Sequence, residues 1–504
     1  MSGAGQPASY EYPPSPRPSG CGQRLKRACG CGCGSVVLLL VIFGAVDGIL
    51  AARYGAQVQQ ELQRLRAAGK PLKGMDLGPP PVPDDQNAAP LYLKAAEIEK
   101  PHEGQPSGAS MPAMPGGPPA SSGNRVVGYD EADWDNPAQM GELARWLQQH
   151  REALALMREA TARPQCRFDT QWQSVVGVAF PHYPEMRSLA RFENAAAAVA
   201  SFQGNQAEAL DRLRIGLVAS RRASDAPLLI PLLVGVAMDA MVMRSAGYVV
   251  SRGPLPEAKA RQLAEELGRV DHRRVFARAM QGERVCGLET FEMVKSGSAR
   301  ASGWFYGVCT ATLFSSREFL MWFYGTPAGP LLRPVLYQDE LLYLRLTERQ
   351  EEIGGKPWRE AQPLAKQLQA DFDSAPWWGA VTSIAMGVWS GAQTKAETAG
   401  ARRDLLQIVL GLKVYRQRNG SYPDRVDALR KLNWPVPMDR FSGKPFVYRR
   451  QGNSFLLYSI GQDLKDDGGR PNWVLVRDKG RRDALKQKYG DDAGDVVWLD
   501  WKKG

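Results

Sequence analysis

The chain has 504 residues, of which 44% are hydrophobic, so it is long enough for two or three folded domains with sizeable cores. Its formal net charge is +11, and most of the excess falls after residue 400. A basic surface can face anionic lipid, cell-envelope polymer or nucleic acid. The sequence contains no nucleic-acid-binding motif, so we expect no nucleic-acid partner.

The first 34 residues are rich in Pro, Gly, Ser and Cys, which predicts a disordered cytoplasmic leader. The apolar run that follows, SVVLLLVIFGAVDGILAA over 35–52, is long enough to cross a bilayer, because a spanning helix takes roughly 17–25 residues. Four basic residues precede this run, opposed only by Glu11, and predict an N-terminus inside and everything after it outside: Arg17, Arg24, Lys26 and Arg27. We therefore expect a single-pass protein of the bacterial inner or plasma membrane with an extracytoplasmic C-terminal part.

A cleaved signal peptide is the alternative interpretation of 35–52. The long leader before the run, and the lack of a small-x-small site after it, favour an anchor instead. Asp47 lies inside the run, where a carboxylate is costly unless it is protonated, paired or close to the membrane interface.

Seven cysteines fall on both sides of the apolar run. The three that follow it are widely spaced, which is not typical of a disulfide framework. The four that precede it lack the paired CxxC spacing of a zinc site, and their role stays open between a flexible spacer and acylation: Cys21, Cys29, Cys31 and Cys33.

Residues 53–129 predict a helical stalk, a proline-rich turn and a low-complexity insertion. Residues 130–394 carry apolar side chains at helical spacing and predict a helical domain, including an antiparallel helix pair joined at Gly204. The stretch 226–250 is nearly apolar enough to span a membrane. It contains Asp239 and Arg244, which would be costly in lipid, so we expect a buried helix there. The aromatic-rich stretch 304–325 is expected in a core or domain interface.

From about 395 the pattern changes, which predicts a separate α+β domain over 395–504. One helix over 394–420 stops at an Asn-Gly pair. Short strands are expected over 444–450 and 454–460, joined by a hairpin turn, and a last strand over 495–501.

The loop after the hairpin, GQDLKDDGG over 461–469, gathers three carboxylates among glycines: Asp463, Asp466 and Asp467. Calcium prefers several hard oxygens supplied by flexible loops, so these three residues are our candidate calcium ligands. As an EF-hand the loop fails, because Lys465 stands at its third position and Val474 at its twelfth. The alternative is a turn with solvated carboxylates.

The tail contains, in order, a helix ending in LKVYRQRNGSYP, the segment MDRFSGKPFVYRR and the loop FLLYSIGQDLKDDGG. This succession resembles the globular part of type II secretion major pseudopilins, whose loop commonly binds calcium. The resemblance implies a pseudopilin-like module in which Asp491, Asp492 or Asp495 supplies further ligands. The tail departs from the family in following a long helical domain, and no prepilin cleavage site precedes the apolar run. The stalk, LRAAG…PPPVPDDQNAAPLY, resembles uncharacterised single-pass membrane-anchored bacterial proteins, which implies no activity.

Motifs for catalysis are missing from the sequence: it has no GxSxG elbow, P-loop, GxGxxG or HExxH. Glu289 and Glu292 share a helical face, but on an Arg-rich helix this pattern favours ion pairing, and His182 in FPHYP is expected to pack on aromatic rings. The expected fold class is mainly α, with an N-terminal transmembrane helix, a helical ectodomain and a small α+β module. We expect a structural or binding protein of the cell envelope with an envelope protein partner. The alternatives are an envelope hydrolase that uses the helical domain and an accessory component of a type II secretion-like apparatus.

Overall fold

The computed structural model describes residues 21–99, 133–296, 329–386, 391–470 and 494–498, together with Leu320 and Tyr324. The first 20 residues of the predicted leader, the low-complexity stretch 104–124, and most of 304–325 lie outside the described residues. So do Asp491 and Asp492. The described chain is mainly helical, with one small sheet. Its elements in chain order are α1 Cys21–Ala67, η1 Gly74–Asp76, α2 Ala89–Glu99, α3 Pro137–Gln149, α4 Arg151–Ala162, α5 His182–Phe202, α6 Gln206–Ala223, α7 Leu229–Arg252, α8 Glu257–Leu267, α9 His272–Ser296, η3 Gly329–Leu332, α12 Arg333–Gly355, α13 Trp358–Asp373, α14 Ala380–Met386, α15 Ala392–Asn419, η4 Val426–Leu432, β1 Val447–Gln451, β2 Ser454–Ser459 and β3 Val496–Val497.

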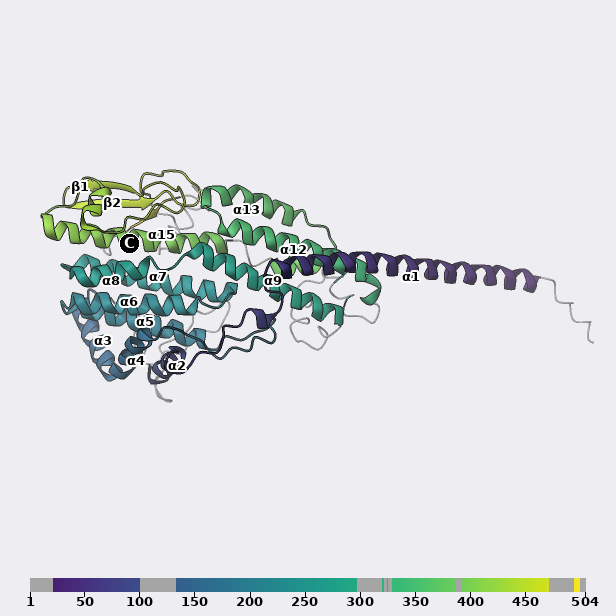
Figure 1. Ribbon diagram of the computed structural model, residues 1–504, viewed down its shortest axis with the longest axis horizontal. Helices are drawn as coiled ribbons and strands as arrows, with labels where there is room; N and C mark the ends of the chain where they lie inside the picture. Colours follow the sequence, from purple (N-terminus) through teal and green to yellow (C-terminus); the bar gives the residue numbers. More distant parts are fainter. Residues whose placement is uncertain are drawn as a thin grey trace, which may run out of the picture.

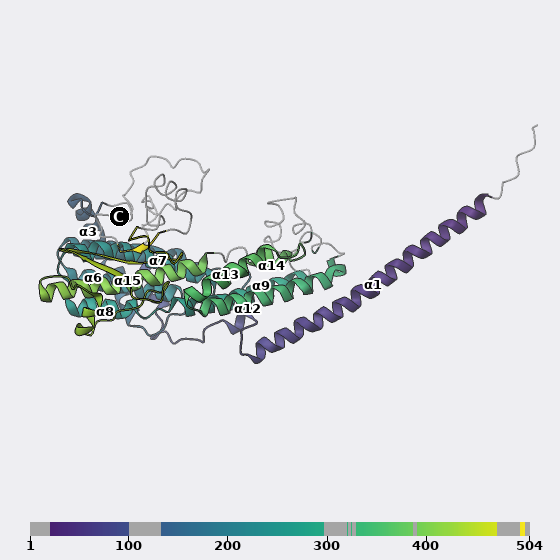
Figure 2. The same ribbon diagram turned by 90° about the horizontal axis from the view of Figure 1, so that it is seen from above.

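The helices of the body lie side by side in layers (Figure 1). Helices α2, α3 and α4 form one face, α5 and α6 follow, then α7 and α8, then α15, and the small sheet covers the opposite face. Helices α9, α12 and α13 extend this stack toward α1 (Figures 1 and 2). The layered arrangement buries helices on several sides, so their apolar residues are not confined to one narrow stripe.

Helices α5 and α6 form the antiparallel pair predicted around Gly204. Gly204 has a φ of +81°, which a side chain would make unfavourable. The side chain of Asn205 caps α6 by accepting a hydrogen bond from the Glu208 N–H at 3.1 Å. The run AAAAVA at 195–200 is buried throughout, and its small side chains let α5 approach its neighbours closely.

Helix α7 is one of two described helices that are long and apolar enough to cross a membrane. Half of its most apolar window is buried in the body, where α7 packs against α5, α6, α9 and α15. It is therefore a helix of the body, as its charged residues led us to expect.

The tail forms the predicted hairpin, although its first strand begins three residues later than expected. β1 and β2 pair antiparallel from Val447 opposite Tyr458 to Gln451 opposite Ser454, and β3 pairs with the end of β2. Helix α15 ends at Gly420, whose φ is +76° and whose N–H donates to the Arg416 carbonyl at 2.8 Å. The Asn-Gly stop is therefore a left-handed helix cap.

Helix α15 shares its core with both the helical body and the sheet. Leu405 and Leu410 belong to the same buried cluster as Leu263 of α8 and Leu457 of β2. The division at about 395 stays a prediction, and the core runs continuously across it.

Helix α1 is continuous over 47 residues, or about 70 Å at 1.5 Å per residue. It begins at Cys21, inside the leader for which we expected disorder, since adding residues to an existing helix costs far less than nucleating one. Its far end projects beyond the body (Figures 1 and 2).

Candidate functional site

The loop over 461–469 is held against the helical body. The Trp358 Nε1–H and the Gln362 side-chain amide, both on α13, donate to the Gln462 carbonyl at 3.0 and 2.7 Å. Gly461 and Gly469 have φ angles of +73° and +83°, so the chain reverses tightly at each end of the loop. These contacts give the carboxylates of the loop defined positions.

The three candidate calcium ligands have different hydrogen-bond partners. Asp466 Oδ1 accepts from the Tyr458 hydroxyl and the Gly468 N–H, both at 2.8 Å, and these bonds lower the pKa of Asp466. Asp467 accepts from Arg470 at 2.6 Å and from the Gly494 N–H at 3.0 Å. Oδ1 of Asp466 and both carboxylate oxygens of Asp467 therefore already have hydrogen-bond donors.

Asp463 is the third candidate ligand. Its Oδ1 accepts from the Lys465 N–H at 3.2 Å, and its pKa is raised, chiefly by burial. Within the described residues, no group of three His, Cys, Asp or Glu side chains is arranged to hold a metal ion. The calcium site stays a prediction.

The structure brings Asp495 to this loop, where it accepts hydrogen bonds from the backbone. Its fully buried carboxylate accepts from the Gly469 N–H at 2.7 Å and the Asp467 N–H at 3.4 Å. Burial, helped by the nearby charges of Asp467 and Asp466, raises the pKa of Asp495 to about 6. Asp495 thus closes the loop onto β3 through the backbone.

A second polar cluster is buried between α6, α7, α9 and α15. Arg403 Nε and Nη2 donate to the two oxygens of Asp239 at 2.6 and 2.7 Å, forming a bidentate pair. The Ser220 hydroxyl donates to Asp239 Oδ1 at 2.5 Å, and His272 Nε2 lies 3.5 Å from Asp239 Oδ2. Burial opposes ionisation of Asp239, but Arg403 and His272 hold its pKa well below the usual range.

Ser220, His272 and Asp239 are the residue types of a hydrolytic triad, but their geometry differs from one. Ser220 donates to the carboxylate, whereas a nucleophilic serine donates to the histidine. The void beside them holds only about 10 Å³, which is about one water molecule. The cluster therefore joins helices and leaves no room for a substrate.

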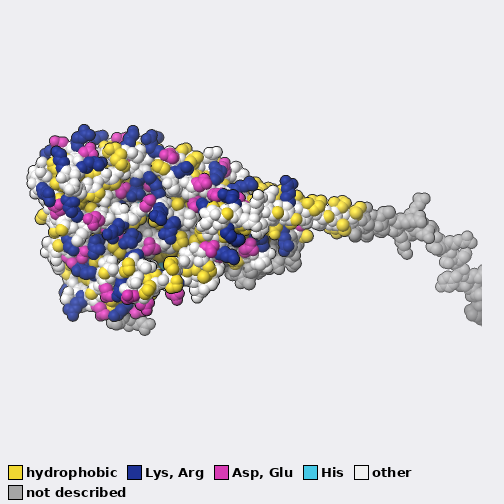
Figure 3. Space-filling model, in the orientation of Figure 1, with side chains coloured by type: hydrophobic (Ala, Val, Ile, Leu, Met, Phe, Trp, Pro, Cys, Tyr) yellow, Lys and Arg dark blue, Asp and Glu magenta, His cyan; other side chains and the backbone are white. Residues whose placement is uncertain are grey.

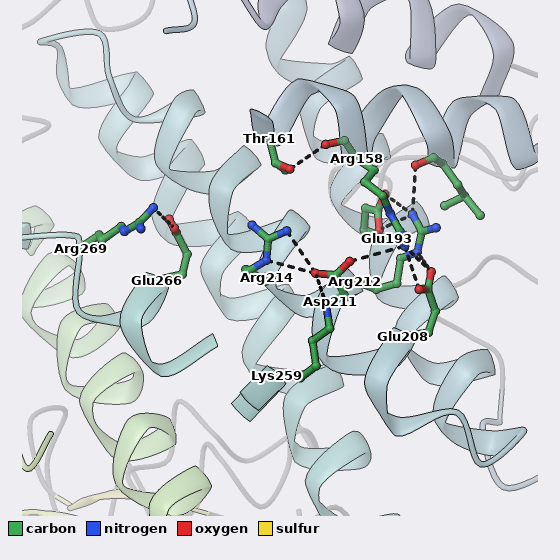
Figure 4. A network of polar contacts seen from close by, with 11 residues as sticks. Arg158, Thr161, Glu193, Glu208, Asp211, Arg212, Arg214, Lys259, Glu266 and Arg269 are labelled. Atoms are coloured by element: carbon green, nitrogen blue, oxygen red, sulfur yellow. Dashed lines mark hydrogen bonds and ion pairs between the residues drawn. The ribbon is translucent and has the colours of Figure 1, made fainter. Parts of the chain in front are cut away.

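A third network links α4, α5, α6 and α8 (Figure 4). Arg212 lies between two carboxylates, 2.7 Å from Glu208 and 3.2 Å from the fully buried Glu193. Burial raises the pKa of Glu193 to about 7, although Arg212 acts in the opposite direction. Asp211, the residue before Arg212 in α6, pairs with Arg214 at 3.1 Å.

The remaining candidates from the sequence have structural partners. Glu289 accepts from the backbone N–H groups of Val175, at 2.6 Å, and Gly74, at 3.1 Å, and Glu292 pairs with Lys295. Glu292 thus forms an ion pair, as we expected, with a lysine of the same helix, whereas Glu289 accepts hydrogen bonds from a neighbouring loop in place of an ion pair. The His182 ring stacks on Phe168 with centroids 3.8 Å apart, and burial lowers its pKa to about 4.

Neither described cysteine of the body is a reactive thiol. Cys166 and Cys286 are both free and partly buried, and burial raises the pKa of each thiol to about 12. At neutral pH both are protonated, and the thiolate is the nucleophilic form.

No protein-family model, curated protein or solved structure is similar to this chain. Its function is therefore argued from its own geometry. Sequence reasoning noted Asp239 as costly in lipid and missed its partner Arg403, which lies 164 residues later. The only signal was an aspartate in an apolar stretch, which predicts that a cation lies nearby without indicating which one.

Proposed function

We propose that the protein is a membrane-anchored, extracytoplasmic structural or binding protein of the bacterial cell envelope. One observation carries the proposal: a single uninterrupted helix, α1, combines an exposed apolar half with a half that packs on the body. The large apolar residues from Leu38 to Val46 are each at least 48% exposed. None of the apolar window is buried in the body, which is the pattern expected of a lipid-facing span.

The surface of the molecule supports the same division. Figure 3 shows hydrophobic side chains on the projecting part of α1, whereas Lys, Arg, Asp and Glu are scattered over the body. A soluble surface rarely exposes so continuous an apolar segment. A bilayer covers it without a protein partner.

The second half of α1 is fastened to α12. Val58 and Leu65 are fully buried, and Gly55 lies so close that an added Cβ would be 3.3 Å from the Tyr337 ring. Arg64 pairs with Glu348 on the same side. Because helix and body are packed together, the body would stand at a defined distance from the membrane.

The junction brings one cationic residue of the body within electrostatic range of Asp47, without an ion pair between them. Arg333, the first residue of α12, acts electrostatically on the Asp47 carboxylate. Asp47 lies five residues before the end of the apolar run, or about 8 Å at 1.5 Å per residue. A cation near this carboxylate at interfacial depth offsets the cost that the sequence indicated.

The two alternative functions have less support. The Ser220, His272 and Asp239 cluster of the described residues lacks triad geometry and space for a substrate, so it does not support a hydrolase. The accessory role in secretion rests on the tail resemblance alone.

Protease added to intact spheroplasts tests the proposal. A chain with different epitope tags at residues 1 and 504 should lose the C-terminal tag and keep the N-terminal one. Protection of the C-terminal tag would contradict the topology. Finding both tags on one full-length membrane polypeptide before proteolysis excludes a cleaved signal peptide.

A matched control inverts the basic flank. Changing Arg24, Lys26 and Arg27 to glutamate removes the charge that orients the span and leaves the apolar run unchanged. This variant should show a reduced fraction of chains with an accessible C-terminal tag.

A further inference from the structure

Helix α12 packs along α1 and runs in the same direction. The ring of Tyr337 lies against Gly55. Further along both helices, Glu348 pairs with Arg64. Residue numbers rise together on the two helices, so they are parallel where they pack (Figure 1). At the other end of this contact, α12 begins beside the apolar run of α1.

The start of α12 reaches past the outer end of the apolar run. Arg333, its first residue, acts electrostatically on Asp47. Asp47 precedes Ala52, the end of the run, by five residues, or about 8 Å along the helix axis. The short helix η3, Gly329–Leu332, comes directly before α12 and also packs beside α1. This corner of the body, residues 329–335, therefore lies at the level of the last turns of the apolar run.

The side chains at this level are of the kinds found at a membrane interface. Leu331 is 49% exposed, and Arg333 is exposed as well. On α1, the exposed Arg53 and the half-buried Tyr54 directly follow the apolar run. A single exposed leucine is ordinary on a soluble surface, but beside a membrane span it lies where lipid covers it. Basic and aromatic side chains collect at the membrane–water boundary, where arginine keeps its charged group near the headgroups and its apolar part in the lipid.

We propose that the corner of the body is inserted into the interface of the membrane that α1 spans. Leu331 packs among the lipid chains, and the Arg333 guanidinium lies between Asp47 and the lipid phosphates. The partner is the lipid of this same bilayer, because the corner is continuous with the span. Two contacts then hold the body, the span and the corner, so it cannot rotate freely about α1. This inference rests on the proposed function, since the corner reaches the bilayer only if the apolar run crosses it.

Lipid quenching of a fluorophore on single cysteines tests the proposal. The full-length chain carries serine in place of its native cysteines and one labelled cysteine: Leu331→Cys at the corner, Ile49→Cys in the span or Met438→Cys in the tail. Each protein is reconstituted into vesicles of phosphatidylcholine and phosphatidylglycerol that carry a nitroxide on the upper part of the lipid chains. Met438 is the matched control, because its exposure of 47% is close to that of Leu331. It precedes β1, which lies at the end of the body away from the projecting part of α1 (Figure 1).

The corner probe and the span probe should each lose most of their fluorescence to the lipid nitroxide, and the tail probe should lose none. Quenching of the span probe but not of the corner probe would overturn the inference and leave the anchor intact. If neither is quenched, the span and the corner both fail. A corner probe shielded from the lipid nitroxide and from aqueous iodide would mean that a second copy of the chain covers the corner, which also contradicts the proposal. Because Leu331 is half exposed, cysteine there leaves the core intact, and urea unfolding of each labelled chain checks this.

Discussion

Removing Arg403 should destabilise the body more than removing almost any other single side chain. Arg403 and Asp239 are 1% and 4% exposed at their side chains, and their bidentate contact joins α15 to α7. Arg403→Met leaves the Asp239 carboxylate buried with only Ser220 and His272 close to it. Breaking such a pair by removing one partner costs about 3–5 kcal/mol.

The assay is urea unfolding of the full-length protein in micelles, followed by tryptophan fluorescence. Arg450→Met is the matched control, because Arg450 pairs with Asp424 at 2.9 Å on the surface and such pairs contribute about 1 kcal/mol or less. Replacing both Asp239 and Arg403 by apolar residues should cost less than Arg403→Met alone, since neither charge is then left buried and unpaired. A loss of less than 1 kcal/mol for Arg403→Met would refute the reasoning.

Three further predictions use the same unfolding measurement. The pKa of Glu193 is raised from 4.5 to about 7, so the native state holds a proton that the unfolded chain releases in this pH window, and the free energy of unfolding falls by up to about 3 kcal/mol as the pH rises from 4.5 to 7. Glu193→Gln should remove this fall. A pH profile that the variant leaves unchanged would contradict the prediction. Gly287→Ala should cost about 1–3 kcal/mol, because the new Cβ would lie 2.1 Å from the Tyr343 ring; a neutral effect would show that α9 and α12 can separate. If the tail loop binds calcium, the ion at 100 times its dissociation constant should stabilise the chain by about 2.7 kcal/mol. The variant with Asp466→Ala and Asp467→Ala should show no such stabilisation. Identical unfolding of the unmutated chain in calcium and in chelator would contradict the calcium site.

Local patterns in the sequence were enough to predict many of the elements. The α5–α6 pair around Gly204, the tail hairpin and the Asn-Gly stop of α15 all depend on residues a few positions apart. Charged residues in the sequence distinguished the buried helix α7 from the exposed apolar part of α1, because α7 carries both Asp239 and Arg244 inside its apolar stretch. Periodicity, capping residues and charge are short-range signals, so they can be recognised in a single sequence without an alignment.

The contacts that define the candidate sites are long-range and could not be predicted. Asp239 and Arg403 are 164 residues apart, and Arg333 lies near Asp47 although most of the helical body separates them in the chain. The spacing of the loop aspartates indicated a shared cation, but the structure gives Asp466 and Asp467 separate donors, Tyr458 and Arg470. Spacing limits how close the side chains can come and does not determine where they point.

Cysteine labelling on intact spheroplasts tests the membrane-anchored topology most directly. Two single-cysteine chains are compared, with all other native cysteines replaced by serine. One retains Cys21, at the leader end of α1. The other carries Met75→Cys just beyond α1, where the Met75 side chain is 63% exposed. A membrane-impermeant maleimide should label the Met75→Cys chain in intact spheroplasts and the Cys21 chain only after lysis. Labelling of Cys21 in intact cells, or of Met75→Cys only after lysis, would contradict an anchor that holds the body outside.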